Sequence, residues 1–258
     1  MAVLKLILAY DGSGFHGFAR QPGRRTVEGV LCEALERILG AAPRLSVAGR
    51  TDTGVHAEGQ VISFETETDP GSLQRALNGL LGPEVVVPRA GRAPAGFDAR
   101  LSATARSYRY RLRAAEVPDP FSARYEWHRP GSYRLAAMRR AARLLEGDHD
   151  FASFCRLPKD GRSTVRTLER LSVRKLGDGI WIRARADGFL HQMVRSLVGT
   201  LVAVGVGRAD PESMPGVLAA RDRAAAAPVA PPHGLSLVSV HYGAHPRASG
   251  WSRASGER

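Results

Sequence analysis

The first hundred residues alternate between segments with the period of a strand and segments with the period of a helix. Residues 2–10 read AVLKLILAY and indicate a buried strand, which the DGSG turn at 11–14 ends. Residues 26–40 carry apolar residues at helical spacing, with Thr26 as the predicted N-cap and Gly40 as the stop. The further predicted elements are a strand over 44–49, a strand over 60–67, a helix over 72–81 and a strand over 84–90.

The rest of the chain repeats this β-α-β-β-α-β order. It begins with a predicted strand over 104–114 and an amphipathic helix over 134–147. A hairpin of two strands, a long helix and a closing strand complete the pattern. These elements cover 166–176 and 179–188 for the hairpin, 189–207 for the long helix with a shorter one near 211–220, and 235–243 for the last strand.

Two successive patterns of this kind predict an α+β protein made of two ferredoxin-like halves, the βαββαβ arrangement that RRM domains share. We expect one antiparallel sheet in each half, with two helices on one face, and the two sheets flanking a basic central cleft. The predicted domains are residues 1–100 and residues 101–244. Residues 245–258 are rich in Ser, Gly and Arg without periodicity, so they predict a flexible basic tail.

The charge changes this picture by pointing to a partner. The 258 residues are 43% hydrophobic and 24% charged, which is ordinary for a globular protein, but the formal net charge is +12. A chain this basic favours a polyanionic partner, and nucleic acid first. The basic residues are nearly all Arg, and genome composition is the alternative explanation. A bias toward Arg does not by itself lower the number of acids, however.

Cysteine and hydropathy patterns limit the other classes. Cys32 and Cys155 are the only cysteines, so the sequence predicts reduced thiols in a cytoplasmic protein, without a disulfide framework or a Cys/His metal site. The N-terminal apolar run contains Lys5 and no cleavage site, which indicates a strand and not a signal peptide. The longest apolar stretch, 197–207, is too short to span a bilayer. We therefore expect no membrane association.

Residues 48–57 read AGRTDTGVHA and place an Asp-Thr-Gly tripeptide between two predicted strands. Aspartic proteases use this tripeptide, but they need a second carboxylate of the same kind, and the chain has no second Asp-Thr-Gly or Asp-Ser-Gly. In extended backbone Arg50 and Asp52 point the same way, so we expect them to pair. The guanidinium would hold the carboxylate ionised, which suits a nucleophile and not a general acid. The alternative is a turn Asp that caps its own loop.

Residues 105–113, ARSYRYRLR, alternate between aromatic and basic side chains. Strand geometry places Tyr108 and Tyr110 on one face, and Arg109 and Arg111 on the other. Aromatic residues beside basic ones are typical of sheets on which RNA bases stack. The alternative is a core tyrosine behind a solvated row of arginines, and we expect one of the two tyrosines to lie in the core.

Two further sets of basic residues are candidates for phosphate or carboxylate contacts. Arg195 and His191 are spaced i, i+4 in the predicted long helix and would share a face. Arg195 is either a surface residue or a partly buried group aimed at an anion. His191 alone is too weak a signal to be named as a catalyst. The FARQPGRR loop supplies candidate phosphate contacts at Arg20, Arg24 and Arg25.

Six segments together resemble the bacterial tRNA pseudouridine synthase A family. They occur in the family's order and cover about residues 3–243, and the GRTDTGVHA block is highly specific. The segments are YDGSGFHG at 10–17, VAGRTDTGVHA at 47–57, LSATARSYRY at 101–110, DFASF at 150–154, FLHQMVRSLVG at 189–199 and HGLSL at 233–237.

This resemblance implies an isomerase that converts uridine to pseudouridine at positions 38 to 40 of tRNA, in the anticodon stem-loop, by base flipping. The family's catalytic Asp falls on Asp52. Its Arg that pairs with the Asp and helps to extrude the base falls on Arg50, and its stacking Tyr falls on Tyr108. An Arg of the second half that reaches the Asp falls on Arg195, and a Leu that lines the pocket falls on Leu235.

The resemblance also implies a homodimer in which one tRNA contacts both subunits, with no metal and no organic cofactor, and without DNA as a partner. The family usually reads Gly-Trp-Gln after the first turn, whereas this chain reads Gly17-Phe18-Ala19. Two other functions stay open at this point: a non-catalytic RNA-binding protein, and a pseudouridine synthase of other RNA specificity. The sequence does not choose between addition of Asp52 to C6 of the base and its action at C1′ of the sugar.

Overall fold

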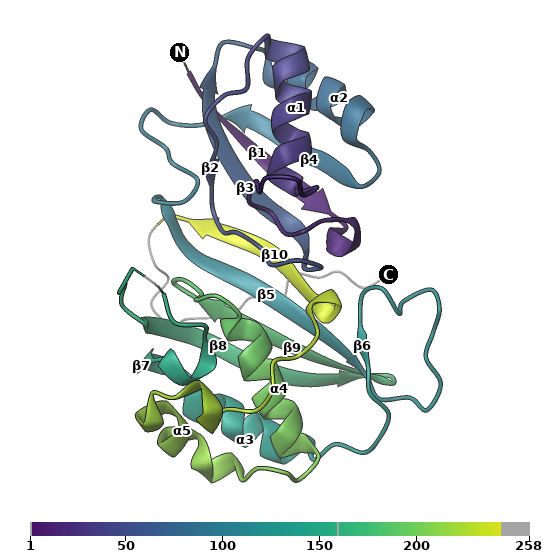
Figure 1. The fold of residues 1–258 in the computed structure, drawn as a ribbon, viewed down its shortest axis with the longest axis vertical. Coiled ribbons are helices and arrows are strands. Elements are labelled where there is room, and N and C mark those ends of the chain that lie inside the picture. The colour runs from purple at the N-terminus through teal and green to yellow at the C-terminus, as the bar shows by residue number, and fades with distance from the viewer. Residues whose placement is uncertain (1, 159, 244–258) are drawn as a thin grey trace.

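The computed structural model describes residues 2–158 and 160–243, so the predicted tail lies outside the described residues. The first half of the chain forms the upper part of Figure 1 and the second half the lower part. The first half contains β1 (Ala2–Tyr10), α1 (Val27–Leu39), β2 (Ser46–Val47), β3 (His56–Thr66), α2 (Pro70–Leu81) and β4 (Val85–Arg92).

The second half has more elements than the sequence predicted. Two short strands, β6 and β7, add to the expected order and pair with β5 and β8. The elements are β5 (Ala103–Arg113), β6 (Trp127–His128), α3 (Leu135–Leu145), β7 (Gly147–Asp150), β8 (Val165–Leu176), β9 (Gly179–Ala186), α4 (Met193–Gly205), α5 (Met214–Ala220) and β10 (Leu235–Tyr242).

Local end signals explain where the first helices begin and stop. The predicted caps of α1 are confirmed: the Thr26 hydroxyl accepts a hydrogen bond from the Gly29 N–H at 3.2 Å, and Gly40 has the left-handed φ of 83°. Helix α2 begins two residues earlier than predicted. The Asp69 carboxylate accepts from the Ser72 N–H at 2.8 Å, and Pro70 occupies the first turn, where its missing N–H costs nothing.

The strands form one mixed sheet, so the prediction of a separate sheet in each half is wrong. The strand order is β4-β1-β3-β10-β5-β9-β8-β7, with β2 on β3 and β6 on β5. Strand β2 covers only the segment of β3 around Ser63 and Ile62, which leaves the beginning of β3 free. Strand β10 pairs there in parallel, Ser236 opposite His56 and Leu237 opposite Ala57. This short pairing joins the two halves.

Within each half the neighbouring strands are antiparallel, except that the short β6 pairs in parallel with β5. The order is β4-β1-β3-β2 in the first half and β10-β5-β9-β8-β7 in the second. Helix α2 packs on β4 and α3 on β8, while α1 packs beside α2 and α3 beside α4 (Figure 1). A single hydrophobic cluster includes Leu6 and Phe64 of the first half and Leu112 and Leu197 of the second. The two halves are thus fastened by core packing as well as by the sheet.

The segment before α4 differs from its prediction. Residues 189–192 were expected to be helical, but the helix begins at Met193 and Gln192 has a left-handed φ of 65°. Within the described ranges, no helix is both long and apolar enough to cross a membrane.

Candidate active site

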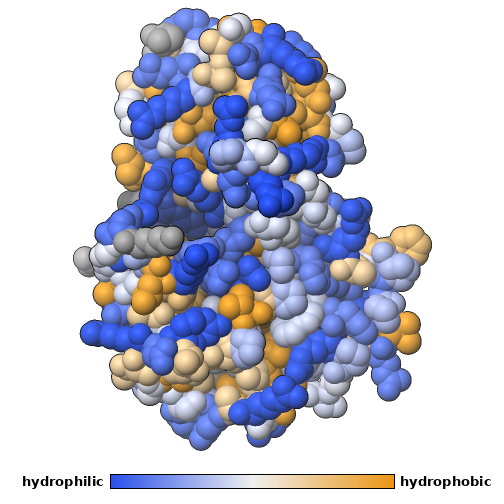
Figure 2. Space-filling view, in the orientation of Figure 1, coloured by the Kyte–Doolittle hydropathy of each residue, from blue (hydrophilic) through white to orange (hydrophobic). Residues whose placement is uncertain are grey.

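A cleft of about 670 Å³ lies where the two halves meet, on the side of the sheet that carries α4. Figure 2 shows this region as a hollow bordered by hydrophilic side chains. Among the described residues that line it, Asp52 is the only acid, and the basic residues are Arg50, Arg100, Arg106, Arg162, Arg166, His191 and Arg195. The predicted basic cleft is therefore present, although one continuous sheet forms its floor.

The loop that carries Asp52 is held from below by the segment that follows β1. Thr51 is buried, and its hydroxyl lies 2.8 Å from the Tyr10 hydroxyl. The Thr51 carbonyl accepts a hydrogen bond from the Phe18 N–H at 3.0 Å. The Phe18 ring is fully buried and lies 6.1 Å from the Tyr10 ring. Phe18, where the sequence departs from the family pattern, thus supports the loop from the core and does not line the cleft.

A tight turn leads from Asp52 into β3. The Asp52 carbonyl accepts from the Val55 N–H at 3.1 Å, and Gly54 takes a left-handed φ of 76°. The backbone at Val55 also touches the first loop, because a Cβ added to Gly12 would lie 2.1 Å from the Val55 carbonyl oxygen. Backbone packing on both sides therefore fixes the position of the Asp52 turn.

The Asp52 carboxylate contacts a guanidinium and an imidazole of the second half across the cleft. Arg195 Nη1 lies 3.3 Å from Oδ2, and His191 Nε2 lies 3.4 Å from Oδ1. The Asp52 side chain keeps 26% of its surface exposed, so it faces both its partners and the open cleft. A carboxylate with a guanidinium and accessible space beside it can act as a nucleophile or stabilise a cation.

Arg195 is fixed by the chain segment that leads toward β10. Its Nε donates to the Ala230 carbonyl at 2.8 Å, and the Ala230 N–H donates to the Arg195 carbonyl at 3.1 Å. Only 14% of the Arg195 side chain is exposed. The guanidinium therefore has one edge anchored and one end free to face Asp52, which a surface arginine would not have.

His191 reaches Asp52 from the turn that precedes α4 and not from the helix. The left-handed Gln192 ends the extended segment and directs the chain into α4, an unusual conformation for a residue with a side chain. The His191 carbonyl accepts from the Arg156 N–H at 3.1 Å, which ties the turn to the neighbouring loop. The expectation that His191 and Arg195 share a helix face is wrong, yet both contact the same carboxylate.

Arg50 lines the cleft and is exposed, but no ion pair or hydrogen bond joins it to Asp52 in the described part of the chain. The expected Arg50–Asp52 pair is therefore wrong. Arg195 and His191 already approach the two carboxylate oxygens, one each, and both are held by the second half. Arg50 is left as an exposed residue of the cleft lining.

Tyr108 forms one wall of the cleft, and Tyr110 lies behind it in the core. The Tyr108 ring is 8% exposed and meets the Phe189 ring edge-on at 5.1 Å. Burial raises the pKa of the Tyr108 hydroxyl, so the ring stays neutral at physiological pH. Tyr110 is fully buried and its hydroxyl donates to the Pro231 carbonyl at 2.9 Å. The expectation of one core tyrosine is confirmed.

Leu235 is 5% exposed, begins β10 opposite Tyr110 and also lines the cleft. The arginines of the first loop lie elsewhere. Arg25 pairs with Glu84 at 2.7 Å, and Arg24 Nη1 lies 3.5 Å from the His16 ring nitrogen. Neither they nor Arg20 are among the residues that line the cleft.

Sequence reasoning missed four arginines that line the cleft instead, namely Arg100, Arg106, Arg162 and Arg166. The alternation that pairs Tyr108 with Tyr110 also places Arg106 on their face, so a signal for that residue was present. Arg106 donates to the carbonyls of Ala48 and Asp187 at 2.9 and 2.7 Å. It therefore links the first half to the second and is committed to structure.

Comparison with known proteins agrees with this geometry. Residues 141–243 match the family model described as tRNA pseudouridine synthase. The chain is 48% identical over 246 residues to tRNA pseudouridine synthase A of Frankia casuarinae, which covers 93% of this chain and 89% of that protein. It is 44% identical to tRNA pseudouridine synthase A of Geobacillus kaustophilus, covering 93% of this chain and 94% of the relative.

The family model and these relatives show a protein of the pseudouridine synthase class. A more distant relative, tRNA pseudouridine synthase A of Geotalea daltonii, is 39% identical and is covered over its full length by 94% of this chain. The chain belongs to the tRNA pseudouridine synthase A family. Among solved structures, a Cbf5-Nop10-Gar1 complex matches with a TM-score of 0.36 and 13% identity, over 78% of this chain and 45% of that one.

Proposed function

We propose that this protein isomerises uridine to pseudouridine at positions 38 to 40 of the tRNA anticodon stem-loop, with Asp52 as the catalytic carboxylate. The observation that carries the proposal is the place of Asp52, alone among acids in a cleft lined by arginines and an aromatic ring. Membership of the tRNA pseudouridine synthase A family supports the reaction and the RNA class. The uridine positions come from the family resemblance of the sequence.

The reaction detaches uracil at N1 and reattaches it at C5, so the bond from C1′ to N1 breaks and a bond from C1′ to C5 forms. C5 loses its proton in the last step and N1, freed from the sugar, carries a proton in the product, so the atoms balance. Asp52 serves this exchange either by adding to C6 of the base or by acting at C1′, where a carboxylate stabilises oxocarbenium-like charge. In both routes Arg195, anchored to the Ala230 carbonyl, orients the carboxylate.

The remaining residues of the cleft serve a base that has left its stack. Extrusion costs a few kcal/mol, which stacking and phosphate contacts repay. The ring of Tyr108, which is 8% exposed and lines the cleft, supplies the stacking surface in this proposal, and Leu235 supplies an apolar wall. Arg50, exposed at the cleft, takes the place that the base vacates. Arg162 and Arg166, which line the cleft from the second half, contact the phosphate backbone in this proposal.

The organisation of the chain enters the proposal in the same way. The antiparallel orders β4-β1-β3-β2 and β10-β5-β9-β8 support two ferredoxin-like halves, divided near residue 100. A homodimer, a cytoplasmic location and phosphate contacts by Arg20, Arg24 and Arg25 follow from the resemblance and from the charge of +12. Those loop arginines lie outside this cleft. In the proposed homodimer they contact parts of a tRNA that Asp52 does not face.

The test is release of tritium from unmodified tRNA transcripts labelled at uridine C5, because only completed chemistry expels that hydrogen. Wild-type protein releases tritium, and Asp52→Asn does not, while its affinity for the tRNA stays near that of the wild type. Substitution of uridines 38, 39 and 40 one at a time then locates the modified positions. Turnover by a clean Asp52→Asn preparation would overturn the catalytic assignment. Tight binding without any release by the wild type would favour the non-catalytic RNA-binding protein.

A further inference from the structure

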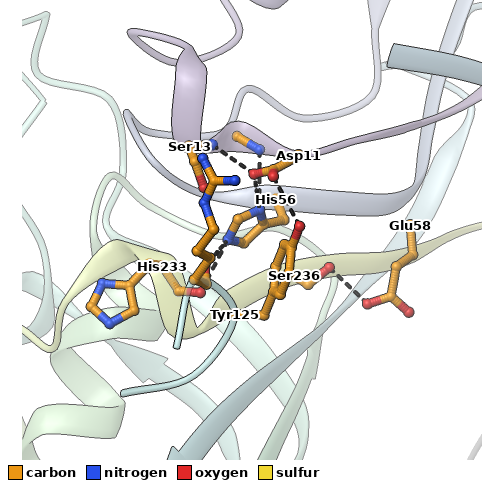
Figure 3. Close-up of polar contacts among 9 residues, drawn as sticks. Asp11, Ser13, His56, Glu58, Tyr125, His233 and Ser236 are labelled. Atoms are coloured by element: carbon orange, nitrogen blue, oxygen red, sulfur yellow. Dashed lines mark hydrogen bonds and ion pairs between the residues drawn. The ribbon is translucent and has the colours of Figure 1, made fainter. Parts of the chain in front are cut away.

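His56 lies at the junction of the two halves and its ring joins both. Its Nδ1 accepts a hydrogen bond from the Gly12 N–H at 3.0 Å and lies 3.1 Å from Asp11 Oδ1, both in the loop after β1. Its Nε2 lies 3.1 Å from the carbonyl oxygens of Arg124 and His233, both in the second half. Carbonyl oxygens only accept, so Nε2 carries the hydrogen. Figure 3 shows the ring enclosed by these groups.

The backbone of His56 belongs to the same junction. It pairs with Ser236 in the short parallel ladder between β3 and β10, which is the only strand pairing between the halves among the described residues. Close packing continues along β3, where a Cβ added to Gly59 would lie 2.4 Å from the Val238 carbonyl oxygen. The His56 side chain therefore reinforces a contact that the backbone makes over only two residue pairs.

A single tight turn of the chain separates His56 from Asp52. The hydrogen bond between the Val55 N–H and the Asp52 carbonyl closes the turn, and His56 is the next residue. Asp52 belongs to the first half, whereas Arg195 and His191 belong to the second. The geometry of the carboxylate relative to its partners thus depends on how the two halves are fixed beside this turn.

We propose that His56 is a positioning residue for the isomerisation, which holds the Asp52 turn of the first half in register with Arg195 and Tyr108 of the second. The inference rests on the proposed role of Asp52. His56 is 6% exposed and is not among the residues that line the cleft, so it acts through the turn and not on the substrate. The titratable groups that face it are Asp11, Tyr125, whose ring lies 5.1 Å away, and His233.

Two substitutions test separately the contact of Nε2 with the second half and the contact of Nδ1 with the first half. His56→Gln places an amide near the position of Nε2 and keeps a donor for the carbonyls of the second half, whereas His56→Asn places its amide near Nδ1 and keeps an acceptor for Gly12. If His56 aligns the halves, the kcat of His56→Asn falls about 100-fold, the effect of a displacement of about 1 Å at the reacting groups. His56→Gln retains more of the rate, and KM and the tRNA dissociation constant stay unchanged in both.

His149→Asn is the matched control for the loss of a hydrogen-bonded histidine. His149 lies in strand β7, at the far edge of the sheet, and its Nε2 lies 3.0 Å from the Glu146 carbonyl oxygen. This variant keeps the wild-type kcat. The thermal midpoint of every variant is measured together with the rate. If His56→Asn does not fold, the kcat of His56→Gln is used for the test.

Three outcomes would overturn the proposal: wild-type kcat in both His56 variants, an equal loss in the two, or a loss in KM and binding with kcat kept. Asp52→Asn, run in the same assay, separates this from the proposed function. Turnover by Asp52→Asn removes the proposed role of Asp52. An inactive Asp52→Asn beside a fully active His56→Asn removes only the role of His56.

Discussion

Asp52 and Arg195 meet across the cleft with 3.3 Å between Oδ2 and Nη1, although 143 residues separate them in the chain. Asp52 is fixed by the core of the first half through Thr51, and Arg195 by its Nε hydrogen bond to Ala230 in the second. Neither half alone contains this contact. Under the proposed function, the relative position of the two halves is therefore a condition for chemistry.

Replacement of Arg195 tests this relationship directly. Arg195→Lys keeps the charge but cannot both donate to Ala230 and reach Asp52, because an ammonium lacks the planar fork. We expect a loss of about 10²–10³ in kcat, the size of a lost oriented donor in an active site. Single-turnover tritium release with saturating enzyme measures it. Retention of the full rate by Arg195→Lys would show that charge alone suffices.

Tyr108 lines the same cleft as Asp52. Its hydroxyl makes no hydrogen bond with the described residues, and burial raises its pKa. Tyr108→Phe is therefore expected to keep near wild-type turnover, whereas Tyr108→Leu loses stacking of about 1–3 kcal/mol. Comparison of kcat/KM for the two variants measures the difference. Equal loss in both would assign the role to the hydroxyl.

Arginines that line the cleft are expected to contribute to the salt dependence of tRNA binding, whereas Arg140, which lies outside it, is not. Arg162→Gln and Arg166→Gln each remove one proposed phosphate contact, so each reduces the slope of log Kd against log salt by about 1. Arg140→Gln is the control, since Arg140 is on α3, pairs with Glu212 and does not line the cleft. Binding is titrated at several salt concentrations. The same slope for all four proteins would remove Arg162 and Arg166 from the interface.

Tyr10 predicts how stability changes in alkali. Burial raises its pKa to about 12 from the ordinary value of 10.0, against the opposing hydrogen bonds with Thr51 and Gln60. The folded state thus binds the proton more tightly, and this stability is complete below pH 10 and is lost as the pH rises through 12. Two pKa units correspond to about 3 kcal/mol.

Urea unfolding of wild type and Tyr10→Phe between pH 8 and pH 12 measures this effect. The free energy of unfolding falls less steeply above pH 10 in Tyr10→Phe, although Tyr10→Phe is less stable at pH 8 by about 1 kcal/mol because the hydrogen bond to Thr51 is lost. Parallel curves for the two proteins would show that other groups cause the alkaline loss.

Much of the local structure was predictable because its causes lie within a few residues. The Thr26 cap and the Gly40 stop of α1, the alternation of β5 and the turn after β1 depend on neighbours in sequence, and the structure has them where predicted. The basic composition and the Asp-Thr-Gly block likewise pointed to RNA and to Asp52 without knowledge of any contact. The left-handed φ of Gln192 could not be predicted from the sequence, since the apolar pattern around this residue predicts a helix.

What the sequence by itself determined is the order of the longer elements and the family, and it predicted Asp52 as the catalytic acid and RNA as the partner. Only the tertiary structure decided that β10 joins β3, because the short β2 leaves that edge open. It also decided that Asp52 contacts Arg195 and His191 and not Arg50, two positions away. Local periodicity predicts on which face of its own strand or helix a side chain lies. The choice among cationic partners depends on which groups the folded core holds rigidly at the distance of a hydrogen bond.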